Sequence, residues 1–533
     1  MGSSSFVGSW ENAPFFPDKG PTIPEYSLSD STKMSQRQLT LVLILVVVGM
    51  AAGFLVLLFK PPVTVAVEKR LADYAAERAA GTLPKDPAAT AAASAEAKAP
   101  TAEKVDVTGK LATFDGKPGT ETGSWPRFRG QDFSNTVPGP PVLEHWPEGG
   151  PPALWRTKVG QGYAGPVAHQ GRVFLLDYDE KEEGDSLRVF SLADGKEIWR
   201  RTYKAPIKKN HGFSRTVPAV TDDYVVTVGP RCLVMCNRPA TGEFLWGMDL
   251  VADYGTEVPL WYTGQCPLID DRVAVLAPGG KALLMGVDCA TGKVVWQTPN
   301  PDHWGMSHSS VVPATLLGRK MYVYCAKEGT VGVAADGADR GQVLWRTTAW
   351  AHSVTSPSPL PIDDHRIFVT AGYGGGSLML GLKEANGPMV AEALYELEKT
   401  VFSCEQHTPL AYQNHLFAVL PKDAGEFRAQ FACMSLEGKI VWTSGKTERF
   451  GLGPFLRVGE DVFILDDDGT LSLVKASPAS YERLAQARVL HGREAWAPMA
   501  FVDGRLVLRD FEEMICLDVR ANSQLTLNRG KGS

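Results

Sequence analysis

The chain has 533 residues, of which 44% are hydrophobic and 21% charged, the composition of an ordinary globular protein with enough residues for a large core. A formal net charge of −6 excludes the basic footprint expected of a nucleic-acid-binding protein. The eight cysteines include no CxxC and no adjacent pair, which excludes zinc ribbons, thioredoxin-type chemistry and covalent haem attachment, and we expect most of them to be small buried hydrophobes.

The N-terminal region predicts a membrane anchor. Residues 1–38 are rich in Ser, Pro and Gly without periodicity, which is typical of a disordered tail. Leu39 to Phe59 is an uncharged stretch of 21 residues, about 31 Å long as a helix, and is therefore predicted to be a transmembrane helix. Lys60-Pro61-Pro62 follows it in place of a small-residue cleavage site, which favours an uncleaved signal anchor. Basic residues flank both ends, so charge does not set the orientation.

Residues 60–123 are predicted to connect this anchor to the globular part. Val63 to Ala80 has the periodicity of a short juxtamembrane helix. From Gly81 to about Lys110 the chain is rich in Ala, Pro, Lys, Glu and Thr, a composition typical of a linker, and we expect a spacer.

One short motif recurs through the rest of the chain. Asp194-Gly195-Lys196-Glu197-Ile198-Trp199 returns four more times, complete or shortened, and its Trp alone appears once without the turn. The motif tryptophans are Trp155, Trp199, Trp246, Trp296, Trp345 and Trp442. Successive intervals of 44, 47, 50 and 49 residues, then 97, correspond to one unit each and a final pair. A period of about 40–50 residues with one Gly turn and one aromatic is typical of a β-propeller.

The units can be counted from their strands. Inner strands are expected to begin near Pro166, Pro218, Pro267, Val311, Pro359, Pro409, Pro454 and Pro498, which makes eight. Only seven outer strands follow them, two of these lacking Trp, at Leu394–Tyr395 and Val489–Leu490. The missing outer strand is available at the other end, as residues 153–159, and pairing it with the last three strands would close the ring. We therefore predict an all-β, eight-bladed propeller over residues 124–520, followed by a tail at 521–533.

The recurring residues have an architectural explanation. A Trp on each outer strand can fill the wedge between neighbouring blades, while its N–H needs an acceptor there. The Gly before it permits the tight turn that joins the third and outer strands. Blades five and seven lack the Trp, so their junctions are expected to pack differently.

The repeat, with the entry segment Ser124-Trp125-Pro126-Arg127-Phe128-Arg129-Gly130, resembles the pyrroloquinoline-quinone (PQQ)-type propeller repeat. It is similar to BamB-like propeller proteins of planctomycetes and related bacteria. The resemblance implies a non-catalytic scaffold that needs no cofactor and binds other envelope or membrane proteins. It also implies that the propeller lies on the periplasmic side, which together with the predicted anchor makes this a single-pass protein of the inner (cytoplasmic) membrane.

Two other functions remain open. PQQ-dependent alcohol or sugar dehydrogenases share the eight-bladed plan and hold PQQ and Ca²⁺ in the central funnel. Their adjacent Cys pair is absent here, and the repeat region leaves little room for their long loops. A polysaccharide-binding module is the third interpretation, and it rests on aromatic residues in loops alone.

The loops that join one blade to the next are rich in His and aromatic residues and share one face of a propeller. The candidate binding residues in them are Tyr163, His211, Trp261, Tyr262, His303, Trp304, His308, His352, His407, His491 and Trp496. They indicate either a ligand or peptide pocket at the mouth of the funnel or loops that pack on one another. No catalytic residue is identified.

Three motifs resemble metal or phosphate sites but lack their spacing. His303 and His308 are five apart with no carboxylate or Cys to complete a set, so no metal is expected. Asp466-Asp467-Asp468-Gly469 lacks the remaining ligands of a calcium loop, and Tyr373-Gly374-Gly375-Gly376 lacks a following Lys-Ser/Thr. Both are predicted to be hairpin turns.

Overall fold

The computed structural model describes residues 104–385 and 387–521. Of the two compact units into which the chain divides, Met1–Ala66 lies outside these residues, and the fold below belongs to Val67–Ser533. The predicted tail, transmembrane helix and juxtamembrane helix all precede residue 104 and so lie outside the described part. From residue 104 to 521, no helix has the length and apolar character to cross a bilayer.

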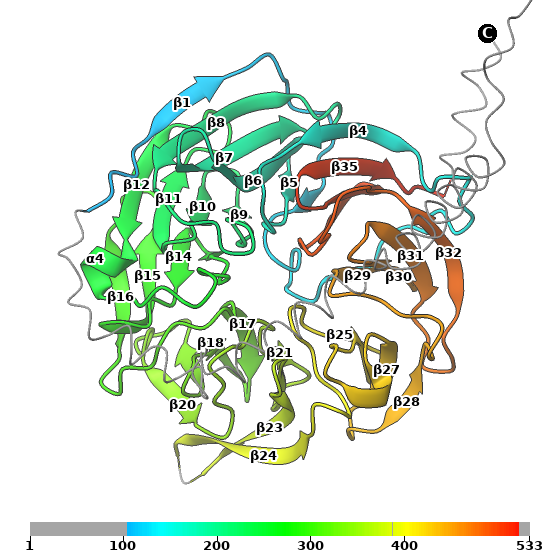
Figure 1. Cartoon of the computed structure of the whole chain (residues 1–533). Coiled ribbons are helices and arrows are strands. Elements are labelled where there is room, and N and C mark those ends of the chain that lie inside the picture. Colours follow the sequence, from blue (N-terminus) through cyan, green and yellow to red (C-terminus); the bar gives the residue numbers. More distant parts are fainter. Residues whose placement is uncertain (1–103, 386, 522–533) are drawn as a thin grey trace, which may run out of the picture. The chain divides into compact units, whose positions relative to one another are not determined.

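The described residues form eight sheets arranged in a ring, and the four strands of each blade are antiparallel (Figure 1). We call the centre of this ring the channel. The sequence prediction of an all-β, eight-bladed propeller is confirmed. The first four blades are blade 1, β5 (Val167–His169), β6 (Arg172–Asp179), β7 (Gly184–Ser191), β8 (Glu197–Lys204); blade 2, β9 (Ala219–Val220), β10 (Val225–Val228), β11 (Leu233–Asn237), β12 (Phe244–Asp249); blade 3, β13 (Leu268–Asp270), β14 (Val273–Leu276), β15 (Ala282–Asp288), β16 (Val294–Pro299); and blade 4, β17 (Val312–Leu316), β18 (Arg319–Cys325), β19 (Thr330–Ala334), β20 (Val343–Thr347).

The remaining blades follow in the same order, from the inner to the outer strand. They are blade 5, β21 (Leu360–Pro361), β22 (Arg366–Ala371), β23 (Gly376–Glu384), β24 (Met389–Leu397); blade 6, β25 (Leu410–Tyr412), β26 (His415–Val419), β27 (Phe431–Ser435), β28 (Ile440–Thr443); blade 7, β29 (Phe455–Val458), β30 (Asp461–Leu465), β31 (Thr470–Lys475), β32 (Arg483–Arg488); and blade 8, β33 (Ala500–Val502), β34 (Arg505–Arg509), β35 (Glu513–Asp518), β4 (Ala153–Lys158). Two short helices, α4 (Leu250–Tyr254) and the 3₁₀ helix η1 (Gly425–Phe427), lie in connecting loops.

The ring closes as the sequence predicts. Strand β4 pairs antiparallel with β35, with Trp155 opposite Cys516, so the outer strand of blade 8 comes from the N-terminal side of the repeat region. This pairing joins the two ends of the repeat region through backbone hydrogen bonds and leaves no gap between the first and last blades.

Side-chain burial explains why each blade is a sheet. The second and third strands are apolar on both faces, as in β10 and β11, where every residue is buried between two neighbouring blades. The outer strands alternate, and in β16 Trp296 and Thr298 are buried while the other residues of the strand are exposed. Strands that are enclosed on both faces carry continuous apolar runs, whereas a strand at the solvent edge shows a period of two. The apolar clusters accordingly span adjacent blades, such as blades 2 and 3.

The motif Trp and Gly meet across the blade junctions. In each of four consecutive pairs, the ring of one blade's Trp lies against the turn Gly of the next: Trp155 with Gly195, Trp199 with Gly242, Trp246 with Gly292, and Trp296 with Gly341. All four glycines have a positive φ between 70° and 86°. The indole N–H of Trp155, Trp199, Trp246 and Trp442 also donates to a carbonyl of the following blade.

Two tryptophans differ in the position of the indole nitrogen, although Trp296 keeps its contact with Gly341. The indole nitrogens of Trp296 and Trp345 lie over Gly286 and Gly332 on the third strands of their own blades. The Trp345 N–H donates to Met321 Sδ at 3.1 Å, and that of Trp296 is buried without an acceptor among the described residues. The shared sequence motif therefore produces two positions of the indole nitrogen, depending on whether the third strand has a Gly beneath the indole.

The blades without a motif Trp use other rings. In blade 5, Tyr395 lies against Gly438 of blade 6 and donates its hydroxyl to the Leu436 carbonyl at 3.0 Å. In blade 7, Trp146, which precedes β4 in the chain, stacks on Phe463 with ring centroids 6.5 Å apart. The outer strand of blade 7 ends at Arg488, directly before the residues Val489–Leu490 by which the sequence marks it.

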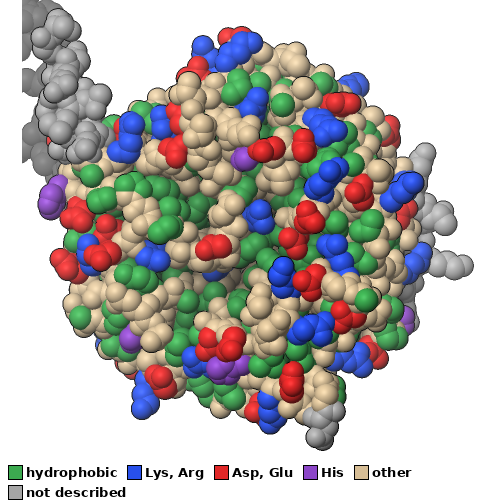
Figure 2. Space-filling view, turned by 180° about the vertical axis from the view of Figure 1, so that it is seen from behind, with side chains coloured by type: hydrophobic (Ala, Val, Ile, Leu, Met, Phe, Trp, Pro, Cys, Tyr) green, Lys and Arg blue, Asp and Glu red, His purple; other side chains and the backbone are tan. Residues whose placement is uncertain are grey.

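Residues 104–123, which the sequence assigns to a linker, pack along the first two blades. Val107 is buried against Gly247 of β12, and the Lys104 ammonium lies 2.8 Å from the Asp253 carboxylate. Strand β1 (Lys110–Thr113) then pairs with β8 as an additional outer strand of blade 1 (Figure 1). On the face seen in Figure 2, acidic and basic side chains are interspersed, so this face has no broad field of one sign.

Candidate functional site

Strand direction divides the propeller into two faces. Each inner strand begins at the loop that arrives from the preceding blade, and the following strands alternate in direction. The blade-to-blade loops and the hairpins between second and third strands therefore share one face, which we call the loop face. The opposite face, the hairpin face, carries the first hairpin and the Gly-Trp turn of every blade. All the candidate binding residues predicted from the sequence belong to loop-face connections.

The channel wall is held together by hydroxyl and thiol groups just before the inner strands. The Val217 N–H donates to Cys266 Sγ at 3.2 Å, and the Cys266 N–H donates to Ser310 Oγ at 3.0 Å. The Ser310 N–H donates to Ser358 Oγ at 3.2 Å, and the Ser358 N–H donates to Thr408 Oγ1 at 2.8 Å. These bonds link blades 2 to 6 in sequence, so the small polar side chains of the wall serve the fold.

A segment from the N-terminal side crosses the channel. Strand β2 (Ser124–Trp125) pairs with β5 of blade 1, and β3 (Thr136–Val137) pairs in parallel with β29 of blade 7. Between them, the Pro126 carbonyl accepts the Val220 N–H of blade 2. We call residues 124–137 the channel strap. Its strands pair near the hairpin-face ends of β5 and β29, so it spans the channel on that side.

Arg129 of the strap lies within the channel, only 4% exposed. It donates through Nε to the Phe133 carbonyl at 2.6 Å, and its two terminal nitrogens donate to the Thr408 and Pro409 carbonyls. Burial lowers the pKa of Arg129 to about 9. A cavity with room for about one water lies beside it, lined also by Phe128, Asn135, His407 and Pro498.

His407 is buried next to this cavity. Its Nε2 has no partner among the described residues, and burial, reinforced by the nearby positive charge of Arg129, lowers the pKa of His407 to about 4. The imidazole is therefore neutral at physiological pH. A single water in the cavity would hydrogen-bond Nε2. His407 therefore packs the channel wall as a neutral side chain.

The first aromatic cluster of the loop face joins blades 7, 8 and 1. The Tyr163 ring lies 5.1 Å from that of Trp496 and 5.4 Å from that of Phe511. Its hydroxyl donates to Glu494 at 2.6 Å, and the Arg215 guanidinium lies 5.2 Å from the ring. Tyr163 and Trp496, two of the predicted binding residues, are thus brought together.

The second aromatic cluster joins loops of blades 2 to 5. The Trp261 ring lies 5.5 Å from that of Tyr373 and 6.4 Å from that of His308. Tyr373 is 48% exposed, so this cluster reaches solvent. Burial lowers the pKa of His308 to about 3, which keeps it neutral. The sequence singled out Trp261 and His308 but assigned Tyr373 only to a hairpin turn.

The remaining predicted residues have separate environments. His211, His303 and His491 are exposed. Tyr262 donates its hydroxyl to the Lys208 carbonyl, and His352 lies edge-on to the buried Trp350 at 4.3 Å. Trp304 is buried against Gly329. The predicted set therefore includes both surface residues and residues that pack the loops together.

Charged groups from three blades gather between the two aromatic clusters, with Asp467 next to Trp496 and Glu405 next to Tyr373. Lys422 lies 3.6 Å from Asp467, whose carboxylate also accepts the Trp496 indole N–H at 2.6 Å. Burial raises the pKa of Glu405 to about 7, and burial together with the neighbouring Asp467 raises that of Asp466 to about 7. We call Glu405, Lys422, Asp466 and Asp467 the mouth cluster. It consists of one basic side chain and three carboxyl groups.

Comparisons with known proteins agree with this architecture. A family model described as outer membrane protein assembly factor BamB matches residues 183–444. BamB of Yersinia pestis is 21% identical over 318 residues, which span 58% of this chain and 75% of that protein. The chain is a BamB-like eight-bladed propeller. It is a distant homologue of BamB.

Two solved structures are similar to the BamB-like propeller in fold, at low sequence identity. BamB of Moraxella catarrhalis aligns over 69% of this chain and 99% of its own, at 12% identity and a TM-score of 0.45. A quinohemoprotein alcohol dehydrogenase from Pseudomonas putida aligns over 75% and 80% respectively, at 12% identity and a TM-score of 0.51. The same fold therefore occurs in an enzyme, and the fold alone does not decide the function of this chain, which has to be argued from its loops.

Several loop-face residues of the BamB-like propeller have left-handed backbones, which is uncommon without glycine. They are His211, Trp261, Tyr262, His303, Tyr373 and Glu494, with φ between 53° and 71°. A left-handed residue with a Cβ costs on the order of 1–2 kcal/mol and persists only where its surroundings hold it. The backbone at Trp261 and at Tyr373 is therefore held in one conformation by the surrounding loops.

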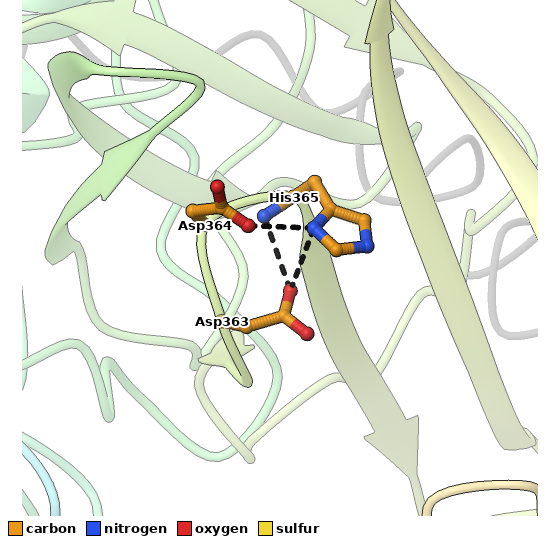
Figure 3. Close-up of side chains that lie close together, drawn as sticks. All are labelled: Asp363, Asp364 and His365. Carbon is orange, nitrogen blue, oxygen red and sulfur yellow. Dashed lines mark hydrogen bonds and ion pairs between the residues drawn. The ribbon is translucent and has the colours of Figure 1, made fainter.

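One group on the hairpin face of the BamB-like propeller resembles a metal site. Asp363, Asp364 and His365, in the turn between β21 and β22, bring their ligand atoms within 4.8 Å of one another (Figure 3). Asp364 lies 2.6 Å from His365 Nδ1, and Asp363 accepts bonds from the backbone and guanidinium of Arg366. These carboxylates already have partners, and they stabilise the turn.

Proposed function

We propose that this BamB-like propeller is a membrane-anchored scaffold that holds another envelope protein on its loop face. The observation that carries the proposal is the Trp261–Tyr373 pair, an aromatic pair on strained but fixed backbone at the mouth of the channel. The distant homology with BamB, named as an outer membrane protein assembly factor, supports the same function.

The chemistry of the loop face fits protein binding. Large aromatic side chains are favoured anchors at interfaces because they bury much area with few rotatable bonds. Val258 and Leu260, 38% and 47% exposed on the same loop as Trp261, extend the apolar surface. A surface held in its bound conformation before contact loses less entropy on binding.

The scaffold is proposed to be attached to the inner membrane through Leu39 to Phe59, with the propeller on the periplasmic side. The support is the length and apolar character of that stretch and the BamB likeness. Alkaline phosphatase fused after Glu103 should be active, since the enzyme folds only outside the cytoplasm. An inactive fusion, with an active cytoplasmic reporter at the same position, would reverse the orientation.

The binding surface is tested by photo-crosslinking in intact cells. A photoreactive amino acid at Leu260 should yield a discrete protein adduct, whereas the same probe at Val295 on the outer edge of blade 3 should yield none. Both positions are similarly exposed, at 47% and 53%, so solvent access is matched. Trp261→Ala should abolish the Leu260 adduct without lowering the amount of protein. Equal adducts at both sites would contradict a loop-face scaffold.

A PQQ-dependent oxidoreductase is the alternative function. The cavity beside Arg129 has room for about one water, so a tricyclic quinone does not fit there while the strap is in place. The eight cysteines are buried and free, and no two are adjacent in sequence. Reconstitution with PQQ and Ca²⁺ should therefore give neither quinone absorbance in the protein fraction nor dye-linked alcohol oxidation. Appearance of both would establish the alternative.

A further inference from the structure

Two cysteines from neighbouring blades lie together at the junction of blades 2 and 3. Cys236 is on β11, the third strand of blade 2, and Cys289 directly follows β15, the third strand of blade 3. Both side chains are fully buried, and both belong to the apolar cluster that joins these blades. They are 53 residues apart, so their proximity is a product of the fold.

The contact between them is direct. Cys236 Sγ donates to the Cys289 carbonyl oxygen at 3.6 Å. Trp246, which lies opposite Cys236 in the β11–β12 pair, donates its indole N–H to the same oxygen at 2.8 Å. The two donors hold the Cys289 backbone against the Cys236 side chain. Hydrogen bonding with the Cys289 thiol, together with burial, raises the pKa of Cys236 far above its usual range.

Other cysteines of the propeller have different partners. Cys232 contacts the Met306 sulfur at 3.8 Å, and Cys266 accepts the Val217 N–H in the channel wall. Cys325 lies 3.5 Å from the Thr330 hydroxyl. These thiols pack against methionine, backbone and hydroxyl groups, whereas Cys236 contacts another cysteine across a blade junction.

We propose that Cys236 and Cys289 form a disulfide between blades 2 and 3 when the chain meets a disulfide-bearing oxidant. The thiolate of one cysteine attacks the oxidant's disulfide and releases one of its two thiols. The second cysteine then attacks the mixed disulfide, forming the Cys236–Cys289 bond and releasing the other thiol. The protein loses two protons and two electrons, and the oxidant gains them.

Burial sets when this reaction takes place. Neither thiol has solvent access in the closed junction, so oxidation occurs while blade 3 is docking on blade 2, or when the junction opens briefly. The bond then restricts the unfolded chain across the segment between the two strands and stabilises the junction. Only the source of the oxidant rests on the proposed periplasmic placement, since that compartment sustains disulfides.

The chemistry is tested on the full chain in mild detergent. Oxidation with glutathione disulfide in sub-denaturing urea, followed by denaturation and thiol counting, should leave six free thiols of the eight. Digestion with trypsin and Glu-C without reduction should yield one linked pair, residues 232–243 with residues 282–293. Because the first peptide also contains Cys232, the variant Cys232→Ser is the matched control and should retain the link, whereas Cys236→Ser and Cys289→Ser should lose it.

Two outcomes would overturn the proposal: eight thiols after oxidation, or a link that persists in Cys236→Ser. A thermal readout separates the bond from mere packing, because reductant should lower the melting temperature of the oxidised wild type and of Cys232→Ser by a few degrees and leave Cys236→Ser unchanged. The cellular compartment is tested separately, by alkylating free thiols with N-ethylmaleimide at lysis and measuring whether the Cys236–Cys289 bond is present in protein taken from cells. A chain that oxidises in vitro but is fully reduced in cells would contradict the periplasmic placement alone.

Discussion

The Trp155 ring on the outer strand of blade 8 lies over Gly195 of blade 1, where an added Cβ would come within 2.7 Å of the ring. Gly195 also has a φ of +70°, so a side chain there is unfavourable for two independent reasons. This contact lies at the closing junction, where the two ends of the repeat region meet.

Gly195→Ala should therefore destabilise the propeller by about 2–4 kcal/mol, adding a clash with the Trp155 ring to the cost of a left-handed alanine. The measurement is urea unfolding. Gly318→Ala is the control, since Gly318 has a φ of +72° but nothing within 4 Å of an added Cβ. The control should lose only the backbone contribution, about 1–2 kcal/mol. Equal losses in the two variants would show that the ring contact contributes nothing.

Replacing a motif Trp by Phe should have an effect that depends on the indole acceptor. The Trp155 N–H donates to the Leu192 carbonyl at 2.8 Å, so Trp155→Phe leaves a buried carbonyl unpaired and should cost about 1–3 kcal/mol beyond the change in ring size. The Trp296 N–H is buried without an acceptor, so Trp296→Phe removes an unsatisfied donor and should cost clearly less. Equal losses in denaturant unfolding would contradict this difference.

Glu405 should make the protein less stable as pH rises from about 4.5 to about 7. The carboxyl has a pKa near 4.5 when unfolded and about 7 when folded, because it is buried beside Asp423 and Asp467 with only partial compensation by Lys422. In that window the folded state holds one proton more, so the unfolding free energy falls by about 1.4 kcal/mol per pH unit. Glu405→Gln should remove this slope, as measured by urea unfolding at several pH values. An unchanged slope would show that Glu405 is ionised in the folded protein.

Below pH 6.5, His308 should make the protein less stable as the pH falls, which is the opposite dependence to that of Glu405. Its pKa is about 3 when folded and near 6.5 when unfolded, so acidification protonates the unfolded chain first and stability falls as pH decreases from about 6.5. His308→Gln should flatten this decline by about 1.4 kcal/mol per pH unit. His303→Gln, at an exposed position of the same loop, is the control and should leave the profile as it is.

The blade count and the closing strand could be predicted from the sequence because each depends on a local repeat. A Gly turn followed by a Trp strand is visible within ten residues wherever it occurs. The mouth cluster could not be predicted in the same way, because Glu405, Lys422 and Asp467 come from three blades and become neighbours only after the ring closes. Likewise, the sequence places both His308 and His491 among the candidate binding residues, whereas folding buries the first and exposes the second.

The channel strap was missed for a further reason. Its entry motif was identified as a mark of the repeat family, but nothing local to Arg129 indicates that its acceptors lie 279 and 280 residues away, at Thr408 and Pro409. A single arginine in a polar segment is usually a surface residue. Only the closed ring brings the Thr408 and Pro409 carbonyls to Arg129, where together with the Phe133 carbonyl they make a buried guanidinium stable.

Arg129→Met should therefore destabilise the propeller by about 3–5 kcal/mol, because it leaves the carbonyls of Phe133, Thr408 and Pro409 without their donors in a buried place. Arg319→Met is the control. Arg319 is 42% exposed and pairs with Asp339 at 2.6 Å, so its loss should cost at most about 1 kcal/mol. Both are measured by urea unfolding, with limited proteolysis as a second readout. In the Arg129 variant, cleavage should begin within residues 124–137, since the strap loses its attachment to blade 6. Cleavage that begins elsewhere, with little loss of stability, would show that β2 and β3 hold the strap without Arg129.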